Sequence, residues 1–292
     1  MMPMLRTVLV MLAGASATTM AQGGTEIHLA PIAEWGISIR VGTPKNITRR
    51  LGYDNQPSFT SDGKGIWYTS QREGQTDIYR YVPAMDSSVQ VTRTGESEYS
   101  ATPLPDGSGF SVIRVERDST QRLWRFKHDG SRPRLVLRDV KPVGYHAWGI
   151  AGEIVMFVLG EPPTLQRASL NRRGVDTLVQ NPGRSIHRIP GRAAVSFVHK
   201  KSAQEWWIRQ IDHHTGAISD LVRTIPGSED YAWTPAGLIL MASGATLYSW
   251  NSLAPGGGWS EVTTFRDSAL QGLKRLAVSP DGKWMAMVSD EK

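Results

Sequence analysis

A tight turn built around Asp-Gly recurs along this chain at a nearly constant interval, and this repeat constrains the fold more than any other feature. The segment "SDGKG" at 61–65 returns as "PDGSG" at 105–109 and as "PDGKW" at 280–284. Alternating apolar and polar residues flank each copy, as in strands joined by hairpin turns. Each repeat has one marker glycine: Gly63, Gly107, Gly152, Gly191, Gly237 and Gly282. The markers are 44, 45, 39, 46 and 45 residues apart, a period typical of four-stranded propeller blades.

The repeat therefore predicts an all-β chain, a six-bladed β-propeller. The last repeat, "LAVSPDGKWMAMVSD", supplies only two strands. The segment 25–32 resembles the third strand of the first repeat at 76–83, and 45–50 resembles its fourth at 89–94. We therefore expect N-terminal strands to complete the C-terminal blade, which removes the exposed ends of the ring.

Aromatic residues also recur within the repeat. Phe59, Trp148 and Trp233 share one position of the innermost strand, and Trp67 and Trp284 are taken to share one position of the second strand. Because such large rings are usually buried, packing between blades is the favoured interpretation, with ligand stacking as the alternative.

Residues 1–21 differ from the rest of the chain. Arg6 precedes an apolar run at 7–15, and small residues lead to Ala21. This order predicts a signal peptide at 1–21 followed by a single propeller domain at 22–292. The apolar run is too short to span a bilayer, so we expect a periplasmic or secreted protein without a transmembrane anchor.

Composition narrows the classes of function. The chain has no cysteine, which excludes disulfides, thiolate metal sites and cysteine nucleophiles. Its net charge is +6, and no nucleic-acid recognition motif is present, so we expect no nucleic-acid partner. Nine basic residues fall between 167 and 209 against Asp176 and Glu205; this predicts a solvated face, with an anionic partner as the alternative.

The segments "KNITRRLGYDNQPSFTSDGKGIWYTSQREGQTDIYRY" and "LAVSPDGKW" resemble the repeats of TolB-type propellers, which are related to WD40-like propellers. The resemblance covers the propeller and lacks a counterpart of the separate N-terminal α/β domain of TolB. It implies a six-bladed fold, a periplasmic location and a role as a docking platform. A fold alone does not imply a function.

The segments that precede the innermost strands are predicted to meet at one rim of the central channel, where propellers bind ligands. The candidate binding residues are Tyr53, Asp54, Asn55, Gln56, Glu98, Tyr99, Tyr145, His146, His187, Arg188, Glu229, Asp230, Tyr231 and Arg275. His146 and His187 are placed at matched positions of adjacent blades, so a divalent metal between them is an alternative to a wet polar channel.

The common catalytic motifs of hydrolases and nucleotide-binding enzymes are missing from the sequence. We therefore assign no catalytic residue and no cofactor, and expect a docking module that holds a protein or peptide of the cell envelope at the rim. Two alternatives stay open. One is a hydrolase or lyase, with or without a metal, that acts on a small molecule such as a sugar or lactone, or on a peptide, and uses His146 or His187 as a general base. The other is a glycan-binding ring that stacks sugars on its tyrosines.

Overall fold

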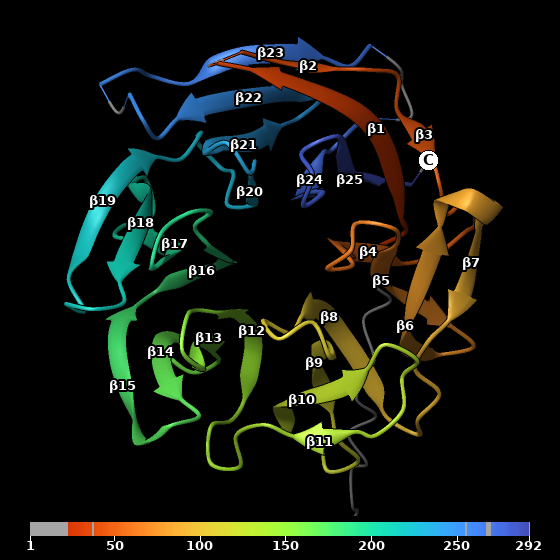
Figure 1. Cartoon of the computed structure of the whole chain (residues 1–292), viewed down its shortest axis with the longest axis vertical. Coiled ribbons are helices and arrows are strands. Elements are labelled where there is room, and N and C mark those ends of the chain that lie inside the picture. Colours follow the sequence, from red (N-terminus) through yellow and green to blue (C-terminus); the bar gives the residue numbers. More distant parts are fainter. Residues whose placement is uncertain (1–22, 37, 255, 267–269, 292) are drawn as a thin grey trace, which may run out of the picture.

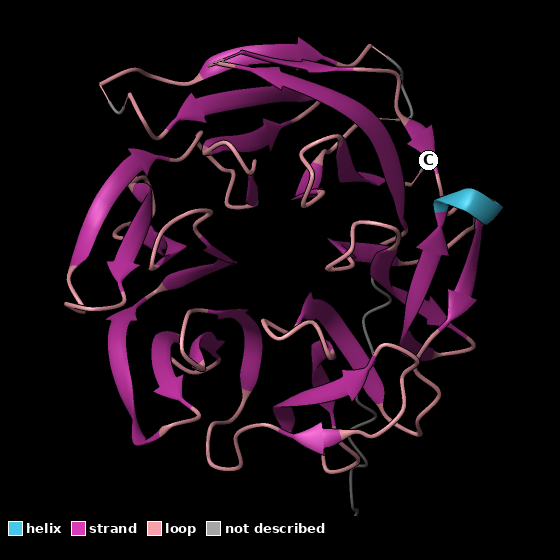
Figure 2. Ribbon diagram, in the orientation of Figure 1, coloured by secondary structure: helices cyan, strands magenta, loops and turns pink. Residues whose placement is uncertain are grey.

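Six antiparallel sheets surround a central channel in this computed structural model, which describes residues 23–36, 38–254, 256–266 and 270–291. Figure 1 shows the sheets arranged as blades of a ring, and Figure 2 shows that nearly all of the regular structure is strand. The predicted six-bladed all-β propeller is confirmed. The signal peptide expected at 1–21 lies outside the described residues.

Blades 1 to 5 each consist of four consecutive strands. Blade 1 contains β4 (Asp54–Phe59), β5 (Ile66–Arg72), β6 (Gln75–Val82), the 3-10 helix η1 (Pro83–Met85) and β7 (Ser87–Gln90). Blade 2 contains β8 (Ser97–Pro103), β9 (Gly109–Val115), β10 (Gln121–Lys127) and β11 (Arg134–Leu135). Blade 3 contains β12 (Val143–Trp148), β13 (Glu153–Val158), β14 (Thr164–Ser169) and β15 (Arg172–Gln180).

Blade 4 contains β16 (Pro182–Arg188), β17 (Ala194–Lys200), β18 (Trp206–Asp212) and β19 (Ile218–Arg223). Blade 5 contains β20 (Tyr231–Trp233), β21 (Leu238–Ser243), β22 (Thr246–Asn251) and β23 (Ser260–Thr264). Blade 6 combines β24 (Lys274–Val278) and β25 (Trp284–Asp290) with β1 (Thr25–Trp35), β2 (Ser38–Val41) and β3 (Lys45–Asn46). The first strand of each blade faces the channel (Figure 1).

Blade 6 closes the ring by joining the two ends of the chain. Strand β1 pairs antiparallel with β25, with Ile27 opposite Val288 and Leu29 opposite Ala286. The fourth-strand position differs from the prediction, because β3 supplies only two residues there and β2 pairs with the far half of β1. Alternate faces of β1 enter two cores, since Ile27 packs with blade 1 whereas Ile32 packs with blade 5.

Two of the blade interfaces use the same pair of residue types. Trp148 of blade 3 donates its indole N–H to Ser111 of blade 2 at 2.8 Å, and Trp233 of blade 5 donates to Ser196 of blade 4 at 2.8 Å. Blade 1 has Trp67 at the position of these serines, and this fully buried ring packs against Ala101 of blade 2. A small residue thus faces a large one at each of these interfaces, which keeps the packing dense.

The predicted burial of Phe59, Trp148 and Trp233 is confirmed, since all three are at most 7% exposed. The predicted match of Trp67 with Trp284 is wrong. Trp284 begins its strand and is 41% exposed, whereas Trp67 lies one residue inside β5. The two turns have the same length, so Trp284 takes the position of Gly65, and the residue equivalent to Trp67 is Ala286.

Candidate functional site

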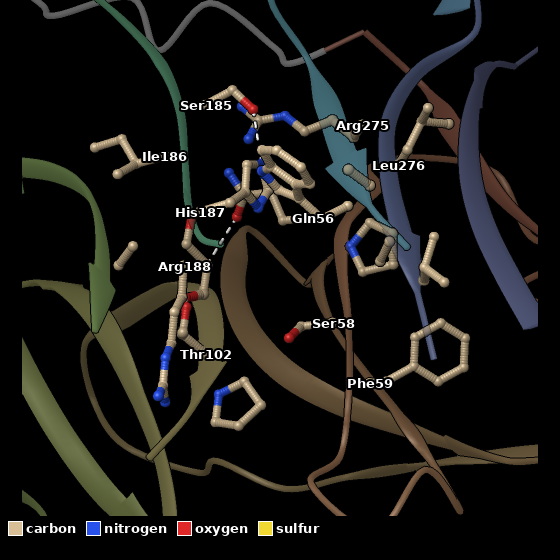
Figure 3. A pocket seen from close by; sticks show the side chains of 18 of the residues that line it. Gln56, Ser58, Phe59, Thr102, Ser185, Ile186, His187, Arg188, Arg275 and Leu276 are labelled. Atoms are coloured by element: carbon tan, nitrogen blue, oxygen red, sulfur yellow. Dashed lines mark hydrogen bonds between the residues drawn. The ribbon is translucent and has the colours of Figure 1, made fainter. Parts of the chain in front are cut away.

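The central channel contains a cavity of about 580 Å³ lined by all six innermost strands, β4, β8, β12, β16, β20 and β24, and by residues at their ends. Figure 3 shows side chains from β4, β8, β16 and β24 around this space, among them Gln56, Thr102, His187 and Arg275. Because the six strands are held in one closed ring, the groups that line the cavity are positioned by the scaffold.

One end of the cavity, which we call the polar mouth, is formed by Tyr145, Arg184, Asp230 and Arg275, from four successive blades. Arg184 Nη2 lies 2.9 Å from Asp230 Oδ2, and Arg275 Nε lies 3.7 Å from Asp230 Oδ1. Arg275 Nη2 donates to the Tyr145 hydroxyl at 2.9 Å. These contacts form a continuous network along the rim.

Charge holds this network together. Burial alone would raise the pKa of Asp230, but the guanidinium groups of Arg275 and Arg184 outweigh burial and hold the pKa below its ordinary value. Asp230 is therefore a carboxylate at neutral pH. The positive charges of Arg275 and Arg184 lower the pKa of Tyr53, but burial outweighs them and raises this pKa to about 12. This tyrosine stays protonated and can act as a hydrogen-bond donor.

Bulges in the innermost strands decide which side chains reach the cavity. The pairing register shifts between Asn55 and Ser58 in β4, between Tyr99 and Thr102 in β8, and between Lys274 and Leu276 in β24. The bulged residues Gln56, Ser100 and Arg275 have positive φ values of 56°, 56° and 43°. All three line the cavity, as expected where a bulge redirects a side chain toward a site.

The other end of the cavity, which we call the proline mouth, has prolines at equivalent positions of four blades: Pro105, Pro190, Pro235 and Pro280. Arg188 lies beside them at the end of β16 and is exposed. Its guanidinium has no ion pair or side-chain hydrogen bond among the described residues. The cavity lining thus carries three arginines against one carboxylate, and Arg188 is available to a ligand.

The two candidate histidines do not face each other. Trp148 ends β12 at the position where Arg188 ends β16, so the residue of blade 4 equivalent to His146 is Ile186 and not His187. His146 Nε2 contacts Ser111 Oγ of blade 2 at 2.7 Å, whereas the ring of His187 packs edge-on against Tyr231 of blade 5. The predicted matched register is therefore wrong, because successive residues of a strand point to opposite faces.

Both histidine rings are held neutral. Burial lowers the pKa of His146 to about 3 and that of His187 to about 4. Among the residues that the structure describes, no group of three His, Cys, Asp or Glu side chains is placed to hold a metal ion. The histidines therefore contribute neutral hydrogen-bonding groups to the channel wall.

Eight of the fourteen predicted residues line the cavity: Gln56, Tyr145, His146, His187, Arg188, Asp230, Tyr231 and Arg275. The other six do not: Tyr53, Asp54, Asn55, Glu98, Tyr99 and Glu229. Tyr53 and Tyr99 are half-buried beside the polar mouth. Glu229 supports it from outside by pairing with Arg184 at 3.3 Å and Lys200 at 2.9 Å.

Asp54, Asn55 and Glu98 are buried in the body of the blades instead of lining the channel. Asp54 pairs with Arg50 at 3.2 Å, and Asn55 donates to Thr25 at 3.2 Å. Glu98 pairs with Arg114 at 3.0 Å. All three precede the bulge in their strands, so their side chains turn toward neighbouring strands.

The sequence-based choice missed Arg184 and Ser185. Arg184 belongs to the segment "GRSIHRI", from which only His187 and Arg188 were selected. Ser185 Oγ lies 2.9 Å from His187 Nε2, on the same face of β16. A basic residue within this predicted rim segment was the available signal, but a linear pattern does not show which side chain a bulge turns inward.

Burial of Glu98 gives folding a testable pH dependence. Burial raises the pKa of Glu98 to about 7, although Thr94 and Arg114 favour its charged form and Asp77 opposes it. The folded protein therefore binds this proton more tightly than the unfolded chain does. The stability that this adds is complete below the unfolded pKa, roughly 4.3, and is lost as the pH rises through the folded pKa. We expect a loss on the order of 3 kcal/mol across this window.

Urea unfolding at a series of pH values measures this effect. The variant Glu98→Gln should flatten the decline of unfolding free energy between about pH 4.5 and 7.5. Glu96→Gln is the matched control, because Glu96 also pairs with Arg114 at 3.0 Å but is more exposed. An unchanged pH profile in Glu98→Gln would contradict the assignment.

Comparisons with known proteins support the fold. No protein-family model matches the chain, and no curated protein does. The "putative TolB" of Agrobacterium tumefaciens matches with a TM-score of 0.67 and 14% identity, covering 93% of this chain and 99% of the other. A gluconolactonase from Xanthomonas campestris matches with a TM-score of 0.63 and 8% identity, over 94% and 99% of the two chains.

An oligogalacturonate lyase, solved in complex with manganese, matches with a TM-score of 0.58 and 12% identity, over 85% of this chain and 80% of the other. At such low identities these likenesses show the fold alone. The chain is a six-bladed propeller structurally similar to that of TolB, and its relatives in structure include a lyase and a lactonase. No helix in the described part of this chain is long and apolar enough to cross a membrane.

Proposed function

We propose that this protein is an exported binding module whose central channel holds an acidic segment of a protein or peptide partner in the periplasm or outside the cell. The observation that carries the proposal is the charge of the cavity lining, in which three arginines, Arg184, Arg188 and Arg275, outnumber a single carboxylate, Asp230. A channel with an excess of one charge concentrates ligands of the opposite charge. Its six-bladed scaffold is one that solved TolB structures share.

The two mouths would act differently on such a ligand. At the polar mouth, Arg184 and Arg275 are already fixed by Asp230 and Tyr145, which lowers the entropy that a ligand must lose to order them. At the proline mouth, Arg188 lacks a partner among the described residues and offers a planar pair of donors to a carboxylate. The prolines beside Arg188 add rigid apolar surface.

One contact supports the enzymatic alternative. Ser185 and His187 form a hydrogen-bonded pair at 2.9 Å in the cavity wall, and burial keeps the imidazole neutral. A neutral imidazole can take a proton from a serine hydroxyl, as in nucleophilic hydrolases. A binding role is favoured over hydrolysis, because Ser185 is only 7% exposed to an attacking substrate. Its hydroxyl oxygen also accepts a hydrogen bond from the Tyr231 backbone N–H at 3.4 Å.

Selection from a displayed peptide library tests the proposal. Wild-type protein should enrich peptides rich in Asp and Glu, and these should bind Arg188→Glu at least tenfold more weakly in a fluorescence titration. Lys283→Glu is the control, since Lys283 is a highly exposed lysine outside the cavity. Peptides that bind Arg188→Glu as tightly as wild type would contradict the proposal. Labelling of Ser185 by a fluorophosphonate, abolished in Ser185→Ala, would favour the hydrolase instead.

A further inference from the structure

A second cavity of about 380 Å³ lies between blades 1 and 2 and shares no lining residue with the channel. Its walls come from the turn between β4 and β5, from Arg80 and Val82 of β6, and from Gly107 and His128 of blade 2. The lining carries two fixed positive charges, Arg80 and Lys64, against the carboxylate of Asp62. This cavity has no part in the function proposed above.

Arg80 is the main feature of this cavity. Its side chain lies against Gly65, where an added Cβ would come within 3.2 Å of Arg80 Cδ. Its Nε is buried without a hydrogen-bond partner, and its guanidinium forms no ion pair among the described residues. A half-buried cation without a counter-charge is unfavourable. No residue that the structure describes therefore supplies an acceptor for Arg80 Nε.

The neighbouring groups are held in place by the protein. His128 Nε2 lies 2.7 Å from the carbonyl oxygen of Gly107, so this nitrogen must carry the proton. The His128 ring stacks on Trp67 at a centroid distance of 5.9 Å, and Trp67 is the cross-strand partner of Arg80. The His128 ring thus lies over Trp67, and Arg80 occupies the neighbouring cross-strand position on β6.

Asp62 does not supply the missing counter-charge. Its Oδ1 accepts hydrogen bonds from Thr60 Oγ1 at 2.6 Å and from the Lys64 amide at 3.0 Å. The equivalent turn of blade 6 has the same pattern, since Asp281 Oδ1 accepts from Ser279 Oγ at 2.6 Å and from the Lys283 amide at 3.1 Å. This use of the aspartate therefore belongs to the turn itself. In blade 1 the turn also borders a cavity and an unpaired arginine.

We infer that the cavity between blades 1 and 2 binds a small oxyanion, either inorganic phosphate or the phosphate group of a monoester. The guanidinium of Arg80 would meet two phosphate oxygens with parallel N–H donors, a geometry that arginine provides and lysine does not. Lys64 would add a second positive charge from the rim. Because the ligand makes charge-assisted hydrogen bonds, binding weakens as ionic strength rises.

Calorimetric titration of the full chain with sodium phosphate, at constant ionic strength in chloride, tests this inference. We expect saturable binding by wild type and at least tenfold weaker binding by both Arg80→Gln and Arg80→Lys, the second because it keeps the charge but not the paired donors. Lys283→Gln, in the equivalent turn of blade 6, should bind as wild type does. Thermal unfolding in chloride verifies that each variant is folded.

Parallel titrations with O-phosphoserine and with acetate distinguish the sources of the anion. Tighter binding of phosphoserine than of phosphate would assign the cavity to a monoester, and the reverse order would assign it to free phosphate. Binding of acetate as strong as that of phosphate would overturn the inference, because a bidentate phosphate site should discriminate. No heat in wild type, or equal heats in wild type and Arg80→Gln, would overturn it as well. The Arg80 variants separate binding in this cavity from binding in the channel, because Arg80 does not line the channel.

Discussion

A chain that begins at Ser38, and so lacks β1, is expected to lose its cooperative fold altogether. Strand β1 buries Ile27, Leu29 and Ile32 to 7% exposure or less and joins the cores of blades 1 and 5. Three such side chains contribute roughly 1.5–3 kcal/mol each, against a total stability of about 5–15 kcal/mol for a domain. Removing β1 also exposes the edge of β25, which would promote aggregation.

Urea unfolding monitored by tryptophan fluorescence measures this effect, with a chain that begins at Gly23 as the reference. The reference should show one sigmoidal transition and the shorter chain none. A synthetic peptide of residues 23–36, added in trans, should restore part of the transition because it supplies the missing strand. A shorter chain that unfolds at the same urea concentration as the reference would refute the closure of the ring by β1.

A single substitution separates packing from strand loss. Ile27→Ala leaves the backbone pairing of β1 intact but removes a side chain that is 0% exposed, so we expect a loss of about 2–5 kcal/mol. Leu51→Ala, at a leucine that is 81% exposed, should change stability by less than about 0.5 kcal/mol.

The closure of the ring could be predicted from the sequence because it follows from the number of strands in each repeat. Every blade needs four strands, the last repeat supplies two, and the missing pattern stands at 25–32 and 45–50. The turn glycines could be recognised for the same reason. Gly63, Gly107 and Gly282 all have φ between 67° and 69°, a conformation that side chains other than glycine rarely adopt.

The orientation of side chains around the channel could not be predicted in this way. Side chains alternate between the two faces of a strand only until a bulge inserts a residue. Five of the six innermost strands have such a register shift. Glu98 and Gln56 were both predicted at the rim, yet Glu98 is buried away from the channel and Gln56 lines the cavity. The packing of Trp67 against Ala101 could not be predicted from the sequence either. It depends on a large residue of one blade lying opposite a small residue of the next blade.

The second large effect is expected from Asp230→Ala. Asp230 is 8% exposed and is the only carboxylate among the described residues that line the channel cavity, where it pairs with Arg184 and lies close to Arg275. Removing Asp230 leaves Arg275 without a carboxylate partner among the described residues, whereas Arg184 keeps its pair with Glu229 at 3.3 Å. Loss of one partner of a buried ion pair costs about 3–5 kcal/mol. Because Arg184 is partly exposed to solvent, we expect a loss near the lower end, about 3 kcal/mol.

The pH dependence identifies the carboxylate as the cause. The pKa of Asp230 is lowered in the folded state, so its contribution is present above the unfolded pKa and is lost as the pH falls through the folded pKa. Wild type should therefore lose stability in acid more steeply than Asp230→Ala, and the two unfolding curves should approach each other as the pH falls below the ordinary pKa of an aspartate. Asp139→Ala, at an exposed aspartate without an ion pair or side-chain hydrogen bond among the described residues, serves as the control.

A double substitution tests whether the stability depends on compensation of charge. If the cost of Asp230→Ala comes from an unpaired guanidinium, then Arg275→Met in the same chain should recover part of it, because the side chain left in place would be apolar. Additive losses in Asp230→Ala/Arg275→Met would instead mean that the two residues act independently. In that case the polar mouth would not be a preorganised unit, and its arginines would have to be ordered anew by each ligand that enters the channel.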